Sequence, residues 1–421
     1  MFRPRSVVAA LLVLAALLAT GCGSSSKSSS SSNKTSTTGA AAIPEPPGGK
    51  KVASGAPVKV GFINTEGTQG IDNVAIRHTA EAGVKYVNEY LGGIAGRPLE
   101  LIVCKEQNSP ESGRQCANDV IRQGAVAIVM GSTGTSESSA NVAVASKIPY
   151  LSDSASTAPE LLTDGAYAPD GGPISLFGGM VDYAASKKYD KVALIGVDVP
   201  SVRQVVDGLA KGFFQKKNIT LNPIYASQTA PDLTPAVTQA TQGGNKAVII
   251  IGNAPFCGAT MKAIAAVGAT NLDRVVIGPC VERDAIKASP PEVLKGSHLI
   301  TWFAPDSDDS EAKLYRAVLA KYAPGVDGGG LNAQGFANVV SFARALAKVT
   351  GDVTPATIKA ALDSATDIPL PVGGGNTFTC GAKLSTLFKS VCSGAYIVDE
   401  IKADGSLSFA GKGDASYVMK S

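Results

Sequence analysis

A cysteine at the end of an apolar run raises the first question about the chemistry of this chain. The stretch VVIGPCVERD, residues 275–284, leads from β-branched residues into Gly278-Pro279-Cys280. A cysteine in such a loop can be a nucleophile, a metal ligand or one half of a disulfide. The choice separates an enzyme from a metalloprotein and from an oxidised, exported protein.

The histidines bear on this choice, because a nucleophile needs a base and a zinc site needs several clustered ligands. The chain has two histidines, His78 inside a helical pattern and His298 at the start of a strand pattern. Neither lies on a loop that could face Cys280, and the sequence has no cluster of cysteine with histidine. We therefore expect no catalytic residue, no metal site and no cofactor, and structural roles for both histidines.

The N-terminus predicts export. Arg3 and Arg5 precede an uncharged apolar run over 7–19, which stops at Thr20-Gly21-Cys22. Signal peptides have this order of charged and apolar residues. The run is shorter than the ~20 residues that span a bilayer, so residues 1–21 are interpreted as a cleaved signal.

The composition of the remaining chain limits its partners. Removal of residues 1–21 lowers Lys+Arg from 38 to 36, against 35 Asp+Glu. A nearly neutral chain has no bulk electrostatic attraction to nucleic acid or to an anionic membrane. The chain is longer than one hydrophobic core ordinarily supports, which predicts two lobes. The Ser- and Gly-rich residues 22–57 predict a disordered tether, since they have little apolar surface to bury.

Short β-branched runs alternate with helical patterns from residue 58 onward, which predicts βαβ units and parallel sheets. The alternation restarts at KVALIGV, so a second α/β lobe follows the first. We assign 58–178 with 302–394 to the first lobe and 179–301 with 395–421 to the second. The predicted strands are 58–64, 99–104, 126–130, 191–197, 219–225, 247–252, 274–278 and 298–305, and the predicted helices are 75–90, 113–122, 136–145, 202–217, 233–242, 258–267, 310–322, 331–348 and 354–364.

The cysteines beyond Cys22 form an even set in an exported chain, which favours disulfides. Cys257 follows one predicted strand and Cys280 ends the next, and neighbouring parallel strands would bring the two close together. A disulfide is therefore the favoured interpretation of Cys280. The predicted pairs are Cys104 with Cys116, Cys257 with Cys280, and Cys380 with Cys392.

Two polar loops follow strands of the first lobe, where ligands of open parallel sheets bind. GSTGTSESSA places Thr135 and Ser136 at a helix start, whose free N–H groups and hydroxyls can hold an anion. YLSDSASTAPELL places Ala155, Ser156 and Thr157 before a second helix start. Simple N-capping is the alternative, and it would explain Thr157 by itself.

At these loops the chain resembles the type I periplasmic binding proteins, in the leucine/isoleucine/valine-binding branch of ABC-transporter receptors. The stretches that carry the resemblance are VKVGFIN with GGIAGRPLELIV, GSTGTSESS, IPYLSDSASTAPEL, and KAVIIIGNAPFCGATMKAIAAVGA leading to VVIGP. LLATGC likewise resembles a bacterial lipobox, although Ala19 stands where leucine is preferred. That second resemblance implies that Cys22 is lipidated.

The family resemblance implies an α/β fold with two Rossmann-like lobes, parallel sheets and a three-crossover hinge that closes over a small ligand. It also implies that the first lobe binds the carboxylate and ammonium of an amino acid. The residues at the matching positions are Thr135, Ser136, the carbonyl of Ala155, Ser156, and the hydroxyl and N–H of Thr157.

The second lobe departs from the family pattern. Ala254 and Cys280 stand where the family has an aromatic and an acidic residue, while Phe256 and Glu282 each follow two residues later. Asn253 precedes them at the strand end and completes the predicted ligand set.

A displaced acidic residue alters the expected ligand, because a buried ammonium needs a carboxylate partner. We expect a carboxylate- or amide-bearing ligand that is not an ordinary branched-chain amino acid, unless Glu66, Glu137 or Glu282 takes over that role. Phe256 and Trp302 could supply an apolar or aromatic wall, and the alternative is that both are packing residues.

The sequence therefore predicts an extracytoplasmic solute-binding lipoprotein, anchored to the bacterial cell membrane through Cys22. It would deliver a small polar, amino acid-like ligand to the permease subunits of an ABC importer, and would act as a monomer. A sensory receptor of the same fold is the alternative. An enzyme is not expected, because the sequence lacks a Walker loop, a G-x-S-x-G elbow and a nucleophile with its base.

Overall fold

The computed structural model describes residues 42–68, 72–152, 155–381 and 384–420. All of these residues belong to one compact unit. The predicted signal peptide and Cys22 lie outside the described residues.

The first lobe is built on a five-stranded sheet in the order β2-β1-β3-β4-β5, and all neighbouring strands are parallel. Its inner strand β1 is buried along almost its whole length, as a parallel strand covered on both faces must be. The strands are β1 (Val58–Thr65), β2 (Leu99–Glu106), β3 (Ile128–Met130), β4 (Tyr150–Leu151) and β5 (Ala166–Tyr167).

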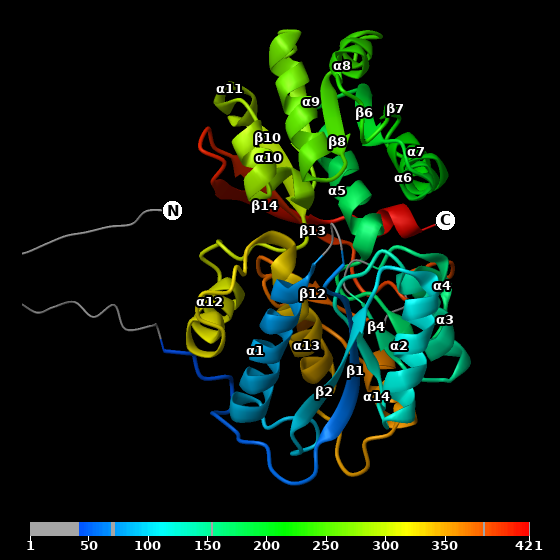
Figure 1. Cartoon of the computed structure of the whole chain (residues 1–421), viewed down its shortest axis with the longest axis vertical. Helices are drawn as coiled ribbons and strands as arrows, with labels where there is room; N and C mark the ends of the chain where they lie inside the picture. Colours follow the sequence, from blue (N-terminus) through cyan, green and yellow to red (C-terminus); the bar gives the residue numbers. More distant parts are fainter. Residues whose placement is uncertain (1–41, 69–71, 153–154, 382–383, 421) are drawn as a thin grey trace, which may run out of the picture. The chain divides into compact units, whose positions relative to one another are not determined.

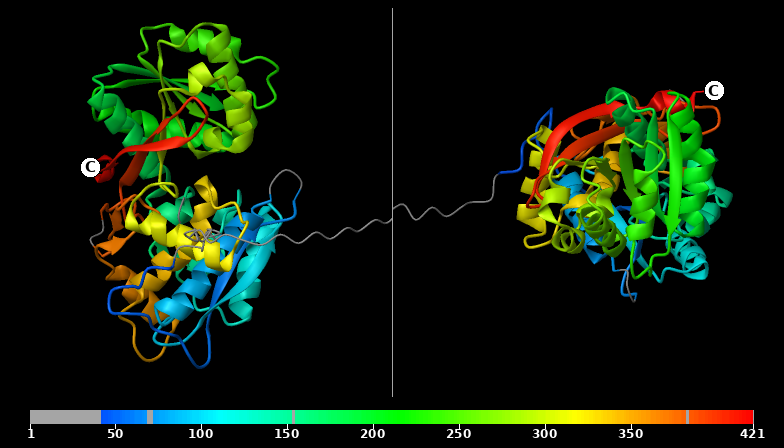
Figure 2. Two further views of the ribbon diagram at one scale, coloured as in Figure 1. Left: turned by 90° about the vertical axis from the view of Figure 1, so that its left-hand side faces the viewer. Right: turned by 90° about the horizontal axis from the view of Figure 1, so that it is seen from above.

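Helices from two distant parts of the chain belong to this lobe. Figure 2 shows the late segments, drawn in yellow and orange, beside the early blue and cyan ones. The helices are α1 (Val74–Tyr90), α2 (Pro110–Arg122), α3 (Ser136–Ala145), α4 (Ala158–Leu162), α12 (Ser310–Tyr322), the 3-10 turn η3 (Gly330–Ala333), α13 (Gln334–Ala345) and α14 (Pro355–Asp363). A two-stranded sheet joins β11 (Ile368–Pro369) to β12 (Thr377–Phe378).

The second lobe is built on a seven-stranded sheet in the order β14-β13-β10-β9-β8-β6-β7. Strands β6 to β10 pair in parallel, whereas β13 and β14 add an antiparallel hairpin, with a bulge between Val398 and Asp399. The strands are β6 (Lys191–Val197), β7 (Thr220–Ala226), β8 (Ala247–Ile251), β9 (Asp273–Val276), β10 (Ser297–Thr301), β13 (Ala395–Ile401) and β14 (Leu407–Asp414).

The predicted helices over 233–242 and 258–267 are present, the second beginning four residues earlier at Ala254, and the predicted helix over 202–217 is interrupted by a π-helical turn. The helices over 172–186, 283–288 and 291–294 were not predicted. The helices of this lobe are α5 (Gly172–Ser186), α6 (Pro200–Val205), the π turn η1 (Val206–Ala210), α7 (Lys211–Gln215), α8 (Thr234–Thr241), α9 (Ala254–Ala266), α10 (Arg283–Ala288), α11 (Pro291–Leu294), and the 3-10 turns η2 (Gly278–Val281) and η4 (Ser416–Met419). Figure 1 shows the order of these elements, with the second sheet in the upper part.

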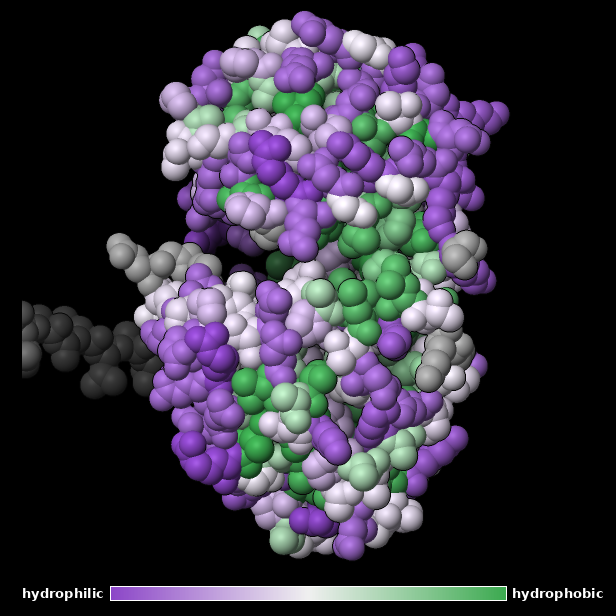
Figure 3. Space-filling view, turned by 90° about the vertical axis from the view of Figure 1, so that its right-hand side faces the viewer, coloured by the Kyte–Doolittle hydropathy of each residue, from purple (hydrophilic) through white to green (hydrophobic). Residues whose placement is uncertain are grey.

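The chain passes between the two sheets three times, after β5, after β10 and after β12. The α/β fold with two lobes and three crossovers, predicted from the sequence, is therefore confirmed. Hydrophilic residues cover most of the face in Figure 3, and hydrophobic residues gather across its middle.

The predicted tether does not extend to residue 57. The backbone N–H groups of Lys51 and Ala53 donate to the carbonyls of Tyr90 and Asn88, at 3.0 and 2.8 Å. Ile43 is buried in the core of the first lobe. Residues 42–57 fit against the end of α1 because Ile43 gains apolar cover there and the backbone groups gain acceptors.

Candidate functional site

The hydroxyl loop after β3 is bonded to a carboxylate of the chain itself. Glu106, buried at the end of β2, accepts hydrogen bonds from the hydroxyls of Thr65, Thr133 and Thr135 at 2.7, 2.7 and 2.9 Å, and from the N–H of Ser109 at 2.8 Å. Burial alone would raise the pKa of Glu106, but the hydrogen bonds from Thr65 and Thr133 and from the backbone of Asn108 and Ser109 together outweigh burial and lower the pKa. The carboxylate is therefore held ionised among these hydroxyls.

The second polar loop has the same arrangement around Glu160. This carboxylate is 1% exposed. It accepts the hydroxyl of Ser136 at 2.9 Å, the N–H of Ser156 at 3.1 Å, and both the N–H and the hydroxyl of Thr157, at 3.1 and 2.8 Å. The Thr157–Glu160 pair is the capping box of α4. The donors predicted to hold a ligand's anion thus hold Glu160.

Ala155 is buried in the loop between β4 and α4, against the first crossover. Its carbonyl lies so close to Gly172 that a Cβ there would overlap the oxygen, and Gly172 has φ +53°, which only glycine adopts readily. Trp302, in the second crossover, donates its indole N–H to the Gly172 carbonyl at 3.0 Å and to the Ser175 hydroxyl at 2.9 Å. Trp302 therefore joins two crossovers, as a packing residue would.

The predicted residues after β8 build the start of α9. The side-chain oxygen of Asn253 accepts the N–H of Phe256 at 3.1 Å, which caps the helix. Ala254 is buried, and Phe256, 2% exposed, packs in the core of the second lobe. Phe256 therefore has a packing role in this lobe, and its contact with a ligand stays a prediction.

The alternative carboxylates differ in their surroundings. Glu66 is buried and already paired, with Arg77 at 2.8 Å and with Lys105 at 3.7 Å. Glu137 is exposed on α3. Glu282 lines a cavity of about 620 Å³. Partial loss of solvent around its carboxyl raises the pKa of Glu282, and the charge of Asp284 raises it further.

That cavity lies between loops of both lobes. Of the predicted ligand residues, only Glu282 lines it. The first lobe contributes Asn73, Asp327 and 329–332, and the second contributes Gly278, 281–284, Leu299, Thr301 and 405–407, with Phe303, Pro305 and Asp306 from the second crossover. The sequence signals missed were two turn-forming stretches, APDSDD at 304–309 and GVDGGG at 325–330.

The three predicted disulfides are present. Cys104 pairs with Cys116, Cys257 with Cys280, and Cys380 with Cys392, with Cα–Cα distances of 5.5, 5.0 and 4.3 Å. The buried bond between Cys257 and Cys280 joins the start of α9 to the 3-10 turn beside the cavity. Cys280 is therefore no free nucleophile.

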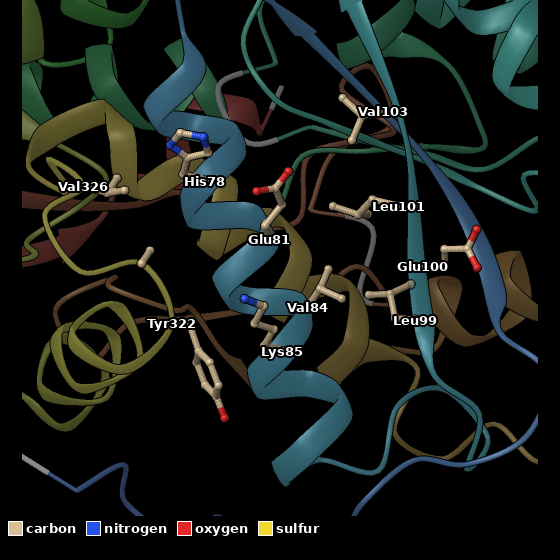
Figure 4. A pocket seen from close by; sticks show the side chains of 11 residues that line it. His78, Glu81, Val84, Lys85, Leu99, Glu100, Leu101, Val103, Tyr322 and Val326 are labelled. Carbon is tan, nitrogen blue, oxygen red and sulfur yellow. The ribbon is translucent and has the colours of Figure 1, made fainter.

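A second hollow, of about 440 Å³, lies on the first lobe between α1, β2 and residues 322–326. Figure 4 shows His78 and Glu81 on its α1 side and Leu101 on β2. None of the predicted ligand residues lines it. His298, the other histidine, lies elsewhere, with its Nδ1 2.8 Å from the hydroxyl of Tyr183.

Comparison with known families decides the kind of protein that carries this geometry. A family model described as periplasmic binding protein matches residues 57–388. The chain belongs to the periplasmic binding protein family. The family predicted from the loop motifs is thereby confirmed, and its members bind solutes outside the cytoplasm.

Solved periplasmic binding proteins share the fold at low sequence identity. An ABC transporter substrate-binding protein from Sphaerobacter thermophilus has a TM-score of 0.72 and 15% identity, over 86% of this chain and 98% of that one. A leucine-binding protein from Thermotoga maritima has 0.65 and 16%, over 84% and 98%. A fatty acid ABC transporter substrate-binding protein from Thermomonospora curvata has 0.65 and 14%, over 86% and 94%.

No curated protein matches the chain. Within the described ranges, no helix combines the length and apolar character needed to cross a bilayer. In the same ranges, no three His, Cys, Asp or Glu side chains are grouped to hold a metal ion.

Proposed function

We propose that this periplasmic binding protein captures a small polar solute in the 620 Å³ cavity and delivers it to the permease subunits of an ABC importer. The observation that carries the proposal is the origin of the cavity walls. Asn73 and Asn332 come from the first lobe, and Glu282 and Thr301 from the second. A solute held by both lobes favours their closed arrangement, since it binds that arrangement better.

The hydrogen-bond donors of the first lobe limit how a ligand carboxylate could bind there. The sequence predicts an amino acid-like ligand with a carboxylate or an amide. A ligand carboxylate bound at Thr157 would have to displace Glu160 from its donors, and one bound at Thr135 would have to displace Glu106. Similar folds are named for leucine and for fatty acid, so the fold does not select the ligand.

Delivery to an importer requires that the receptor stay near the membrane. We propose that Cys22 carries the lipid and that the residues before the folded unit form the tether. A sensory receptor with a membrane signalling partner is the second candidate. Reconstitution with the candidate permease in liposomes separates the two, because only an importer component supports ATP-driven solute uptake.

The direct test of solute capture uses Trp302, the single tryptophan of the chain. It lies between Thr301 and Phe303, which both line the cavity. We expect saturable changes in its fluorescence with the correct solute, identified first by mass spectrometry of the purified protein. Absence of any co-purifying or binding solute would contradict the receptor function.

A further inference from the structure

The cavity carries an excess of negative charge. Its acidic lining residues are Glu282, Asp284, Asp306 and Asp327, and Arg283 is the only basic residue among the described residues that line it. Arg283 pairs with Asp284 at 3.6 Å. No ion pair among the described residues involves the other three carboxylates. The cavity wall is thus left with carboxylates that lack a cationic partner.

A buried carboxylate behind this wall adds to the negative charge near the cavity. Asp399, on β13, is 3% exposed, and no hydrogen bond or ion pair engages its side chain in the described residues. It lines a small adjoining cavity whose only other charged residue is Asp306. Pro305, Asp306 and Leu407 line both cavities, so Asp399 lies directly behind the main one. Burial and the charge of Asp306 raise its pKa to about 6.

The other lining residues indicate which kind of positively charged ligand the cavity could bind. Val281, Leu299, Phe303, Leu331 and Leu407 give the cavity apolar walls, which suit a hydrocarbon body. Metal ions such as Ca²⁺ need six or more oxygen ligands, and the described residues group no three carboxylates for one. Carboxylates accept hydrogen bonds and cannot donate them when ionised, so an ammonium bearing N–H groups is the complementary partner.

We propose, on the basis of the receptor function above, that the anchoring group of the ligand is a protonated amine bound by Glu282 and Asp306, with its hydrocarbon body against the apolar wall. The anion-binding donors of the first lobe remain committed to Glu106 and Glu160 and take no part in this recognition.

The experiment is a titration of the purified full chain with the primary amines from methylamine to hexylamine. The matching carboxylates and primary amides are run beside them, with tetramethylammonium and CaCl₂ as further probes. Thermal unfolding and Trp302 fluorescence at pH 7.5 are the readouts. We expect the amines to bind, more weakly at high salt, and the acids not to bind.

Glu282→Gln and Asp306→Asn should each weaken amine binding by about tenfold or more, as expected for loss of a partly desolvated charge pair. Both side chains are exposed, and no side chain or backbone group of the described residues bonds to them, so the variants should fold normally. Glu292→Gln, on the exposed surface of α11 outside the cavity, is the matched control and should bind like the parent.

Binding of a carboxylate or an amide without binding of any amine overturns the amine proposal and leaves the receptor function intact. So does amine binding that is unchanged in both cavity variants, or a co-purified solute without a basic nitrogen. Stabilisation by CaCl₂ alone would replace the amine with an inorganic cation. Failure of every probe, with no co-purified solute, would count against both the amine and the receptor function.

Discussion

At the scale of single residues, the first lobe uses hydroxyl and N–H groups to bind its own carboxylates. Ser136, Ser156 and Thr157 converge on Glu160, although they come from two helix starts. Bonds from such donors to an ionised acceptor are about twice as strong as neutral ones. We infer that this cluster stabilises the loops after β3 and β4 instead of holding a ligand.

Glu160→Gln should therefore lower the free energy of unfolding by about 1–3 kcal/mol, because the amide accepts these bonds more weakly and brings its own N–H donors into the cluster. Urea denaturation with intact disulfides measures the change. Glu137→Gln, on the exposed face of α3, is the control and should alter stability by less than about 0.5 kcal/mol. Equal values for the two variants would contradict the structural role of Glu160.

Asp399 predicts a pH-dependent stability. Its pKa is raised from 3.8 to about 6 in the folded chain, so folding favours the protonated form. The protonated carboxyl stabilises the fold fully below pH ~4, and this stabilisation is lost as pH rises through ~6. Ionisation of Asp399 therefore lowers the free energy of unfolding by about 3 kcal/mol.

Asp399→Asn removes that ionisation. We expect the variant to be more stable than the parent at pH 7.5, by up to about 3 kcal/mol, and similar to it at pH 4. Denaturation at the two pH values is the measurement. A variant that is no more stable at pH 7.5 would show that Asp399 is compensated by a partner.

At the scale of elements, α1 packs against α13, and the residues just before these two helices, Asn73 and 329–332, line the cavity. The hydroxyl of Thr79 donates to the carbonyl of Asn332 at 2.7 Å, which fixes the turn before α13. A Cβ at Gly335 would overlap the carbonyl oxygen of Ile76. Close contact between the two helices therefore depends on glycine at this position.

Gly335→Ala should destabilise the chain by about 2 kcal/mol or more, since the backbone of α1 must move to admit the methyl group. Gly212→Ala is the matched control, because nothing lies within 4 Å of a Cβ at that position of α7. Alanine favours helix there, so the control should gain up to about 1 kcal/mol. Thermal or urea unfolding of both variants tests the contrast, and equal losses would contradict it.

At the scale of the whole molecule, three crossovers connect two lobes that each have their own core. Trp302 bonds to the first crossover from the second, so a change in lobe arrangement alters its surroundings. Closure of the two lobes over a solute therefore depends on the whole chain and not on either lobe alone.

Membrane attachment also belongs to this scale. We expect Cys22→Ala to move the protein from the membrane fraction to the soluble extracytoplasmic fraction. Each CH₂ group of a lipid chain that is buried in the bilayer contributes about 0.8 kcal/mol to membrane binding, and the variant cannot carry that chain. Fractionation followed by immunoblotting measures this. The control is Cys104→Ala with Cys116→Ala, which removes a disulfide and should leave the protein at the membrane. Continued membrane association of the Cys22 variant would contradict lipidation.

The sequence by itself determined the alternation of strands and helices and the two lobes, because local periodicity and turn residues act over a few positions. It favoured pairing between cysteines close in the chain, and the structure established which cysteines pair. The helix over 310–322 is found with the predicted bounds, as is the one over 136–145.

Only the tertiary structure decided what the polar loops bind and where the cavity lies. Glu106 and Glu160 are brought to hydroxyls from other elements by the order of strands, which no local pattern encodes. Phe256 and Asn253 were assigned to a ligand by position in the chain, but the packing of α9 uses both. Asp306 and Asp399, 93 residues apart, share one cavity because β10 pairs with β13 and the crossover follows it. Side-chain partners that are distant in sequence depend on the complete fold, and so does the chemistry of the cavity.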